Sequence, residues 1–298
     1  MSRILELRKT LEAKEQPANW GTKSASVTAT LMSWNSFFGT IILTEDAPAG
    51  VGDQLLITIA EAISDMKYVR GRLSAIVSAM NKSSWKIKVN CQDTFLTDPE
   101  EKEGKDEAGN TIKYRVFKDS RTTDSAGTVK VSTASSMCQD STKVSAWTFY
   151  NDVTAMQEMT LCPSALSRWG ETTLTSTANS QSALKAKKLN ALKRKAGAEI
   201  ILHELTHSKA IHGQDKKTRD ETFPVTDEDG NEKEVQAYGF DNVRGLAFFD
   251  PAAAITNADS YGLFALDEAM YYDACVWDEG VCTGVDKSGT FTGAHFDY

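Results

Sequence analysis

Three residues in one short stretch have the types and spacing of a metal site with a base beside it. His203 and His207 are separated by three residues within residues 200–208 (IILHELTHS), and Glu204 follows the first histidine directly. In a helix, positions four apart lie on one face, so both imidazoles can reach one tetrahedral ion. Zinc prefers imidazole nitrogens and lowers the pKa of a bound water to about 7, and Glu204 is placed to take a proton from that water.

Histidine is scarce in this chain, yet three of its four histidines fall within residues 203–212. The apolar residues 200–202 that precede the motif indicate a helix buried against other structure. Buried imidazoles without a partner are costly, which favours a single zinc ion over a core helix with two incidental histidines.

A third protein ligand is needed, because hydrolytic zinc sites have three ligands and one open position. The pattern H-E-x-x-H-x-x-G-x-x-H would require glycine at 210 and histidine at 213, where this chain has Ala210 and Gly213. A glutamate on a second helix about twenty residues on is the other common solution, but residues 227–232 (DEDGNE) have the composition of a turn.

The elements that must position these residues follow from periodicity. Short strands are predicted at 26–30 and 40–44, and a long helix from the N-cap Asp53 to Met80. Alternating patterns then predict strands at 85–90, 111–116, 128–132, 146–150 and 156–161, with a charged loop at 98–110. Asp229-Gly230 predicts a hairpin turn, Tyr238 opens a helix, and Pro251 starts another that runs to about 272. This order predicts an α+β fold.

The length of 298 residues allows one large domain or two lobes around a cleft. Residues 1–20 are interpreted as a polar N-terminal segment left from a propeptide. Residues 21–298 are predicted to form a single catalytic domain, with an N-lobe at about 21–212 and a C-lobe at about 213–298.

The charge balance limits the partners. Lys+Arg 33 against Asp+Glu 41 gives a net charge of −8, which disfavours nucleic acid and favours a polypeptide. No apolar run approaches the roughly 20 residues that span a bilayer, so no membrane attachment is expected. We expect a monomer.

The five cysteines favour an oxidising compartment, and we therefore expect a secreted protein although the N-terminus lacks a secretory signal. Cys275 and Cys282 form the predicted disulfide, because they bracket a short turn. Among Cys91, Cys138 and Cys162 the sequence selects no pair.

Three blocks together resemble a known family: residues 203–207 (HELTH), Tyr238-Gly239, and residues 257–265 (NADSYGLFA). They are similar to the aspzincins, the deuterolysin and lysine-specific metalloendopeptidase group of secreted, mostly fungal proteases. The resemblance covers roughly residues 145–272 and implies a zincin-like fold and zinc-dependent peptide hydrolysis.

The resemblance also implies roles for single residues. The family's third zinc ligand is an aspartate three residues before the Tyr-Gly pair, a position held here by Val235, so the adjacent carboxylate Glu234 is the predicted ligand. His212, Asp241 and Asp220 are the alternatives. Tyr238 would donate its hydroxyl to the oxyanion. Asp259 would orient a ligand or shape a substrate pocket.

We therefore expect a zinc endopeptidase, with His203, His207 and Glu234 holding the ion and Glu204 as the base. Lysine-specific members of the family carry an acid just after the motif tyrosine, and Gly262 at that position does not support lysine specificity. A non-catalytic zinc-binding protein of the same fold, which scavenges metal or binds a host protein, is the alternative. A core domain without metal is the third possibility.

Overall fold

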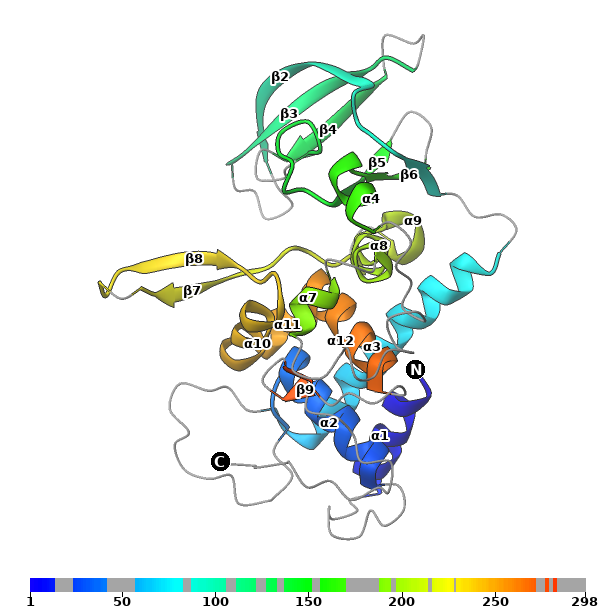
Figure 1. Ribbon diagram of the computed structural model, residues 1–298, viewed down its shortest axis with the longest axis vertical. Coiled ribbons are helices and arrows are strands. Elements are labelled where there is room, and N and C mark those ends of the chain that lie inside the picture. Colours follow the sequence, from blue (N-terminus) through cyan, green and yellow to red (C-terminus); the bar gives the residue numbers. More distant parts are fainter. Residues whose placement is uncertain are drawn as a thin grey trace. The chain divides into compact units, whose positions relative to one another are not determined.

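The computed structural model describes residues 1–13, 24–41, 57–82, 87–105, 111–121, 127–132, 137–151, 156–169, 188–193, 197–213, 216–227, 229–271, 277–278 and 281–282. The chain folds as two compact units, each discontinuous in sequence. One contains residues 1–77, 172–203 and 218–298, and the other contains residues 78–171 and 204–217. Helices and several small sheets make the fold mixed α/β, compatible with the α+β class (Figure 1).

The first unit is mainly helical. Its helices are α1 (Ser2–Glu12), α2 (Ser24–Phe38), α3 (Ile59–Met80), α7 (Leu189–Lys193), α10 (Phe240–Phe249), α11 (Pro251–Ala254) and α12 (Ala258–Tyr271). The unit also contains two antiparallel strand pairs, β7 (Thr222–Thr226) with β8 (Glu232–Gln236) and β9 (Trp277–Asp278) with β10 (Val281–Cys282), and residues 197–203 of α8 (Gly197–Thr206).

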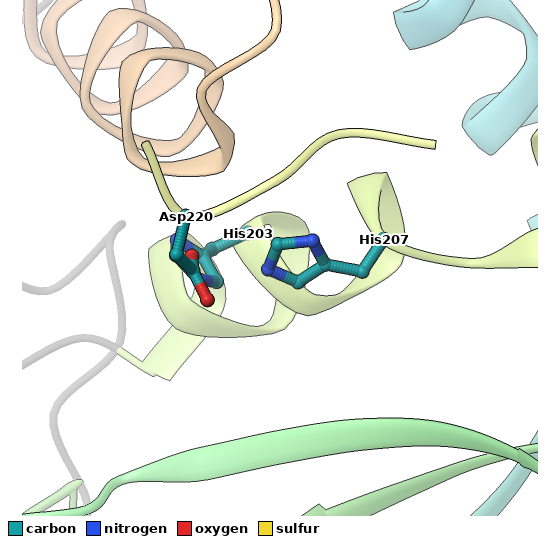
Figure 2. Close-up of side chains that lie close together, drawn as sticks. All are labelled: His203, His207 and Asp220. Carbon is teal, nitrogen blue, oxygen red and sulfur yellow. The ribbon is translucent and has the colours of Figure 1, made fainter. Parts of the chain in front are cut away.

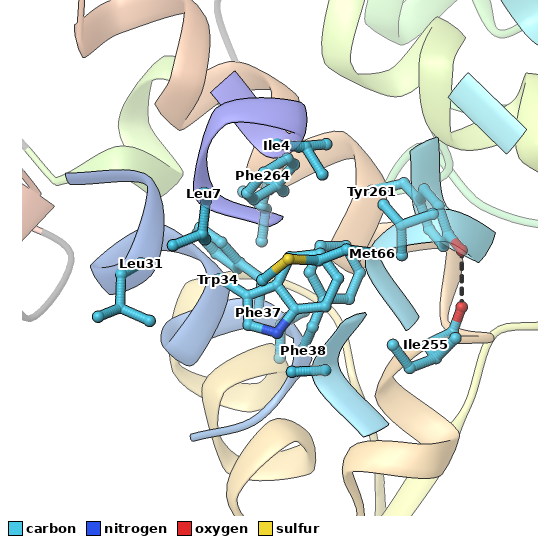
Figure 3. Packing of buried hydrophobic residues seen from close by; sticks show 14 of the residues in the cluster. Ile4, Leu7, Leu31, Trp34, Phe37, Phe38, Met66, Ile255, Tyr261 and Phe264 are labelled. Atoms are coloured by element: carbon cyan, nitrogen blue, oxygen red, sulfur yellow. Dashed lines mark hydrogen bonds between the residues drawn. The ribbon is translucent and has the colours of Figure 1, made fainter. Parts of the chain in front are cut away.

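An aromatic cluster forms the core of this unit (Figure 3). Trp34, Phe37 and Phe38 from α2 pack edge-on or tilted against Phe264 of α12, and Phe38 also contacts Tyr261. All five side chains are buried, and burying a large apolar side chain contributes roughly 1.5–3 kcal/mol. The packing fixes α12, the helix whose first turn carries Asp259.

Two predictions at the N-terminal end of this unit are wrong. Residues 26–30, predicted as a strand, lie in α2, where Val27, Ala29 and Leu31 bury against the core. Tertiary burial therefore overrides the β-propensity of valine and threonine. The long helix begins at Ile59, because Thr58 and Glu61 cap each other's backbone amides in a capping box. Asp53 lies outside the described residues.

The second unit contains two small sheets. Strand β6 (Met156–Leu161) is central in the first, parallel to β1 (Ile87–Asn90) and antiparallel to β5 (Ala146–Asn151). The second sheet has the order β2 (Leu96–Lys105), β3 (Thr111–Asp119), β4 (Thr128–Ser132). Helices α4 (Pro163–Trp169) and α9 (Lys209–His212) belong to the same unit. The predicted loop at 98–110 is wrong for residues 98–105, which form most of β2 and pair with β3.

The structure pairs Cys138 with Cys162 in a disulfide and leaves Cys91 as an exposed thiol. Cys275 lies outside the described residues, so the predicted Cys275–Cys282 disulfide remains a prediction. None of the helices in the described part of the chain has the length and apolar character required to cross a membrane.

Candidate metal centre

The two motif histidines lie one turn apart at the end of α8 (Gly197–Thr206). His203 is buried and His207, just beyond the last helical residue, is half-buried. The amide of His207 donates to the Glu204 carbonyl at 3.2 Å, so a tighter turn with i to i−3 bonding carries the chain from α8 to His207. The predicted pair is therefore presented by one continuous segment.

The carboxylate that lies close to both histidines is that of Asp220. One ligand atom each from His203, His207 and Asp220 lie within 4.8 Å of one another (Figure 2). Nε2 of His203 is 3.2 Å from Oδ1 of Asp220. Asp220 was the last of the alternatives that the sequence offered as third ligand.

Backbone bonds on both sides hold Asp220 in place. The Arg219 amide donates to the Thr256 carbonyl, and the Arg219 carbonyl accepts from the Ala258 amide, both at 2.9 Å. On the other side, the Glu221 amide donates to Oδ1 of Asn257 at 3.2 Å. Asp220 is thus fixed against the residues that lead into α12.

Asp259, in the first turn of α12, fixes the other side of His203. Its Oδ1 is 3.1 Å from Nδ1 of His203, and its Oδ2 accepts from the Gly239 amide at 2.7 Å. An ionised carboxylate can only accept, so Nδ1 carries the proton and Nε2 is left to face Asp220. This arrangement is typical of metal-binding histidines, whose second nitrogen donates to a carboxylate. Asp259 is completely buried, so it is placed to orient a ligand and not to contact substrate directly.

Tyr238 lies beside the histidine and is 40% exposed. The centroids of the Tyr238 and His203 rings are 6.0 Å apart. The next residue, Gly239, has φ +79, a conformation that disfavours side chains. The amide of Phe240 donates to Oδ1 of Asn190 on α7 at 2.8 Å, so Asp259 and Asn190 together hold the turn after Tyr238.

The base candidate Glu204 directly follows His203 on α8 and is 5% exposed. It lies in the same helical turn as the two histidines because the motif fixes its position.

Three predicted or alternative ligands lie outside the group. Glu234 is exposed on β8, opposite Pro224 of β7. Asp241 is exposed in the first turn of α10, and His212 is half-buried at the end of α9. Among these candidates, the structure brings Asp220, and not Glu234, together with the two histidines.

His203 also belongs to a second group of buried side chains, with Glu199 and Asp259. Sequence reasoning did not identify Glu199. Ligand atoms of Glu199, His203 and Asp259 also lie within 4.8 Å of one another, and all three residues are buried. A Cβ on Gly262 would come within 2.5 Å of Oε1 of Glu199, so glycine at 262 makes room for this carboxylate. The helical spacing between Glu199 and His203 is the only pattern that could have indicated the contact.

The donor set of the first group fits zinc. Two imidazoles and one carboxylate are ligands that zinc uses in hydrolytic sites, where a fourth position stays open. With the proton on Nδ1, Nε2 of His203 faces Oδ1 of Asp220 at 3.2 Å, a separation at which both atoms can bind one ion. The 35% exposure of the Asp220 side chain leaves the group accessible from solvent.

The chain was compared with known proteins in three ways. No protein-family model, no curated protein and no solved structure matches it. The residues and their geometry therefore carry the functional argument.

Proposed function

We propose that this protein is a zinc-dependent endopeptidase with a zincin-like fold, which holds one ion with His203, His207 and Asp220. The observation that carries the proposal is the approach of Asp220 to Nε2 of His203 while Asp259 takes Nδ1. A histidine held between a metal-facing carboxylate and a buried one has the environment of a zinc ligand.

The base of the β7–β8 hairpin supports the proposal further. The amide of Ala237 donates to the carbonyl of Glu221 at 2.8 Å, so the chain enters and leaves the hairpin side by side. If the hairpin is left out, Asp220-Glu221 continues directly into Ala237-Tyr238-Gly239. This reads Asp-x-x-Tyr-Gly, the order that the resemblance to the aspzincins implies for the third ligand and the Tyr-Gly pair.

The chain's own residues divide the chemistry between them. A bound zinc ion would supply a Lewis acid and would lower the pKa of a water molecule to about 7. Glu204 accepts the proton of the attacking water and later returns it to the leaving amine. Tyr238 donates its hydroxyl to the developing oxyanion, a contact worth roughly 3 kcal/mol.

The substrate, on this proposal, is a polypeptide, and the protein is a secreted monomer. The Cys138–Cys162 disulfide supports an oxidising compartment. The net charge of −8 favours neutral or basic polypeptides over nucleic acid.

Metal analysis combined with a cleavage assay tests the proposal. The purified protein should contain one zinc per chain and cleave unfolded casein, and a chelator should abolish cleavage until zinc is restored. Stoichiometric zinc without cleavage would identify the alternative, a non-catalytic zinc-binding protein. Absence of bound zinc under saturating conditions would exclude both.

A further inference from the structure

We propose that the outer edge of β8 binds an extended polypeptide as an added strand and leads it to the metal group. The inference rests on the proposed peptidase function and names the docking element of that same site. Among the described residues, β8 pairs with β7 alone, so its second edge is free of sheet partners.

The hydrogen-bonding pattern of the hairpin shows which groups point outward. Bonds from Ala237 to Glu221 and from Asp227 to Asn231 place the bonded pairs at alternate positions. The pair Pro224–Glu234 falls between them, as a non-bonded pair. The backbone N–H and C=O of Glu234, and those of Glu232 two residues earlier, are therefore directed away from β7.

The two edges of the hairpin differ in their ability to accept a strand. On β7 the corresponding outward position is Pro224, which has no N–H and interrupts any added ladder. On β8 the outward positions Glu232 and Glu234 both keep a donor and an acceptor. Strand addition is thus possible on β8 and blocked on β7.

The β8 edge leads directly to the candidate site. Strand β8 ends at Gln236, and Tyr238 follows after one residue. The Asn257 side chain accepts from the Glu221 amide and donates to the Ala237 carbonyl. These two bonds hold the two ends of the hairpin together, next to Asp220 and Tyr238. The open part of the edge ends before Gln236, whose outward carbonyl already accepts from the Tyr238 amide at 2.8 Å and from the Asn242 side chain at 3.2 Å. A polypeptide paired with Glu232 and Glu234 is therefore directed along a strand toward Tyr238.

The hairpin is also held firmly enough to serve as a template. Phe223 of β7 is buried against α10 and stacks with Phe249. A Cβ on Gly245 would come within 2.7 Å of the Phe223 ring, so glycine at this position permits the contact. One face of the hairpin is anchored on α10, while Glu232, Glu234 and Gln236 on the other face are exposed.

The exposed side chains of this face define the preferred partner. Glu232 and Glu234 place two carboxylates at alternate positions of the strand. Side chains on an added strand alternate with the same period, so lysine or arginine at every second position would lie beside these carboxylates. We infer a preference for extended segments with alternating basic residues.

Binding measurements on a zinc-loaded Glu204→Gln background test the edge without requiring catalysis. The probe is a fluorescently labelled, unstructured peptide with lysine at alternate positions, and a glutamine-for-lysine peptide is its neutral counterpart. Glu234→Pro removes the outward N–H, whereas the matched variant Glu234→Ala removes only the charge. Pro224→Ala, on the opposite edge, is the second control, and zinc affinity and thermal unfolding verify that each variant is folded.

Glu234→Pro should weaken binding of the neutral peptide by about five- to tenfold, because it removes a main-chain hydrogen bond, and binding of the lysine peptide by about two- to threefold more, because it also removes the charge. Glu234→Ala should weaken only the lysine peptide, by about two- to threefold. Pro224→Ala should bind like the parent protein. If Glu234→Pro fails to fold, Glu232→Pro at the neighbouring outward position replaces it.

Equal binding by the proline and alanine variants would overturn the proposal that β8 binds a polypeptide as an added strand. The charges on β8 would then serve only to protect an exposed strand from aggregation. Failure of the proposed function has a different signature. A wild-type protein that cleaves no casein, but whose peptide binding is still weakened by Glu234→Pro, refutes the peptidase and retains the docking edge.

Discussion

Asp259 holds Nδ1 of His203 with one carboxylate oxygen at 3.1 Å while its other oxygen accepts from the Gly239 amide at 2.7 Å. One buried side chain therefore contacts both the His203 imidazole and the turn that follows Tyr238. The proposed metal ligand His203 and the proposed oxyanion donor Tyr238 are thus connected through this carboxylate.

Replacing Asp259 with asparagine should disrupt this connection. An amide has one oxygen and one NH2 group, so it can accept from either His203 or Gly239 and must direct donors at the other. We expect zinc affinity to fall by about 10- to 100-fold, as for other partners of metal-binding histidines. Isothermal titration with zinc measures this, and Asp241→Asn, an exposed aspartate on α10, is the control. Unchanged zinc affinity in Asp259→Asn would show that the contact does not orient the ligand.

Removal of the proposed third ligand, Asp220, gives the second prediction. Asp220→Ala removes the carboxylate that faces Nε2 of His203. Zinc affinity should fall by more than about 100-fold, which is more than the loss expected when only a hydrogen-bonding partner of a ligand, such as Asp259, is changed. Glu234→Ala should leave zinc affinity unchanged, because Glu234 is exposed on β8 outside the group. The same zinc titration decides between Asp220 and Glu234 as the ligand. A large loss of zinc affinity in Glu234→Ala with none in Asp220→Ala would identify Glu234 as the ligand.

The part of this site that could be predicted from sequence is local. His203, Glu204 and His207 are within one helical turn, so their spacing alone indicates a shared face. Asp220 could not be identified in the same way, because its position depends on the pairing of Glu221 with Ala237 across the whole β7–β8 hairpin. The spacing that the resemblance to the aspzincins implies, counted along the chain, indicates instead Val235 and its neighbour Glu234, which are within the hairpin.

The fold shows the same division between local and non-local information. The hairpin at Asp229-Gly230 was predicted from its turn residues, and its strands pair as expected. The strand predicted at 26–30 is wrong, because these residues form a helix that is stabilised by burial against α12 and not by intrinsic propensity. The charged segment 98–105 forms a strand because β3 supplies a ladder that its composition does not indicate.

The role of Glu204 gives the third prediction. Glu204→Gln preserves the shape of the side chain but cannot accept a proton, so casein cleavage should fall by about 10²- to 10⁴-fold while zinc binding is retained. Glu103→Gln, at an exposed position of β2, is the control for general effects of charge. Full activity of Glu204→Gln would exclude this residue as the base.

The Cys138–Cys162 disulfide gives the fourth prediction. It joins cysteines separated by 24 positions, and a loop of this size stabilises by about 3.5 kcal/mol in the chain-entropy model. Cys138→Ala should therefore lower the free energy of unfolding by this order, measured by urea denaturation without reductant. Cys91→Ala, which removes the exposed thiol, should leave the free energy unchanged. Equal effects of the two substitutions would argue against the disulfide.

The last prediction concerns pH and rests on Asp267 in α12. Burial raises the pKa of this carboxyl to about 7, with a further contribution from Glu268, against 3.8 in the unfolded chain. The folded state therefore keeps a proton that the unfolded state releases, and stability decreases as pH rises from about 4 to 7, remaining low above that range. Asp267→Asn removes the ionisation, so it should stabilise the protein near pH 8 and have little effect near pH 4.

Urea denaturation at several pH values measures this difference. Asp229→Asn, in the exposed hairpin turn, is the matched control and should leave the pH dependence as it is. Burial also raises the pKa of Glu268, so the free energy of unfolding of the Asp267→Asn variant should still decrease somewhat with rising pH. If Asp267→Asn shows the same loss of stability between pH 4 and 7 as the parent protein, another group, and not Asp267, is responsible for it.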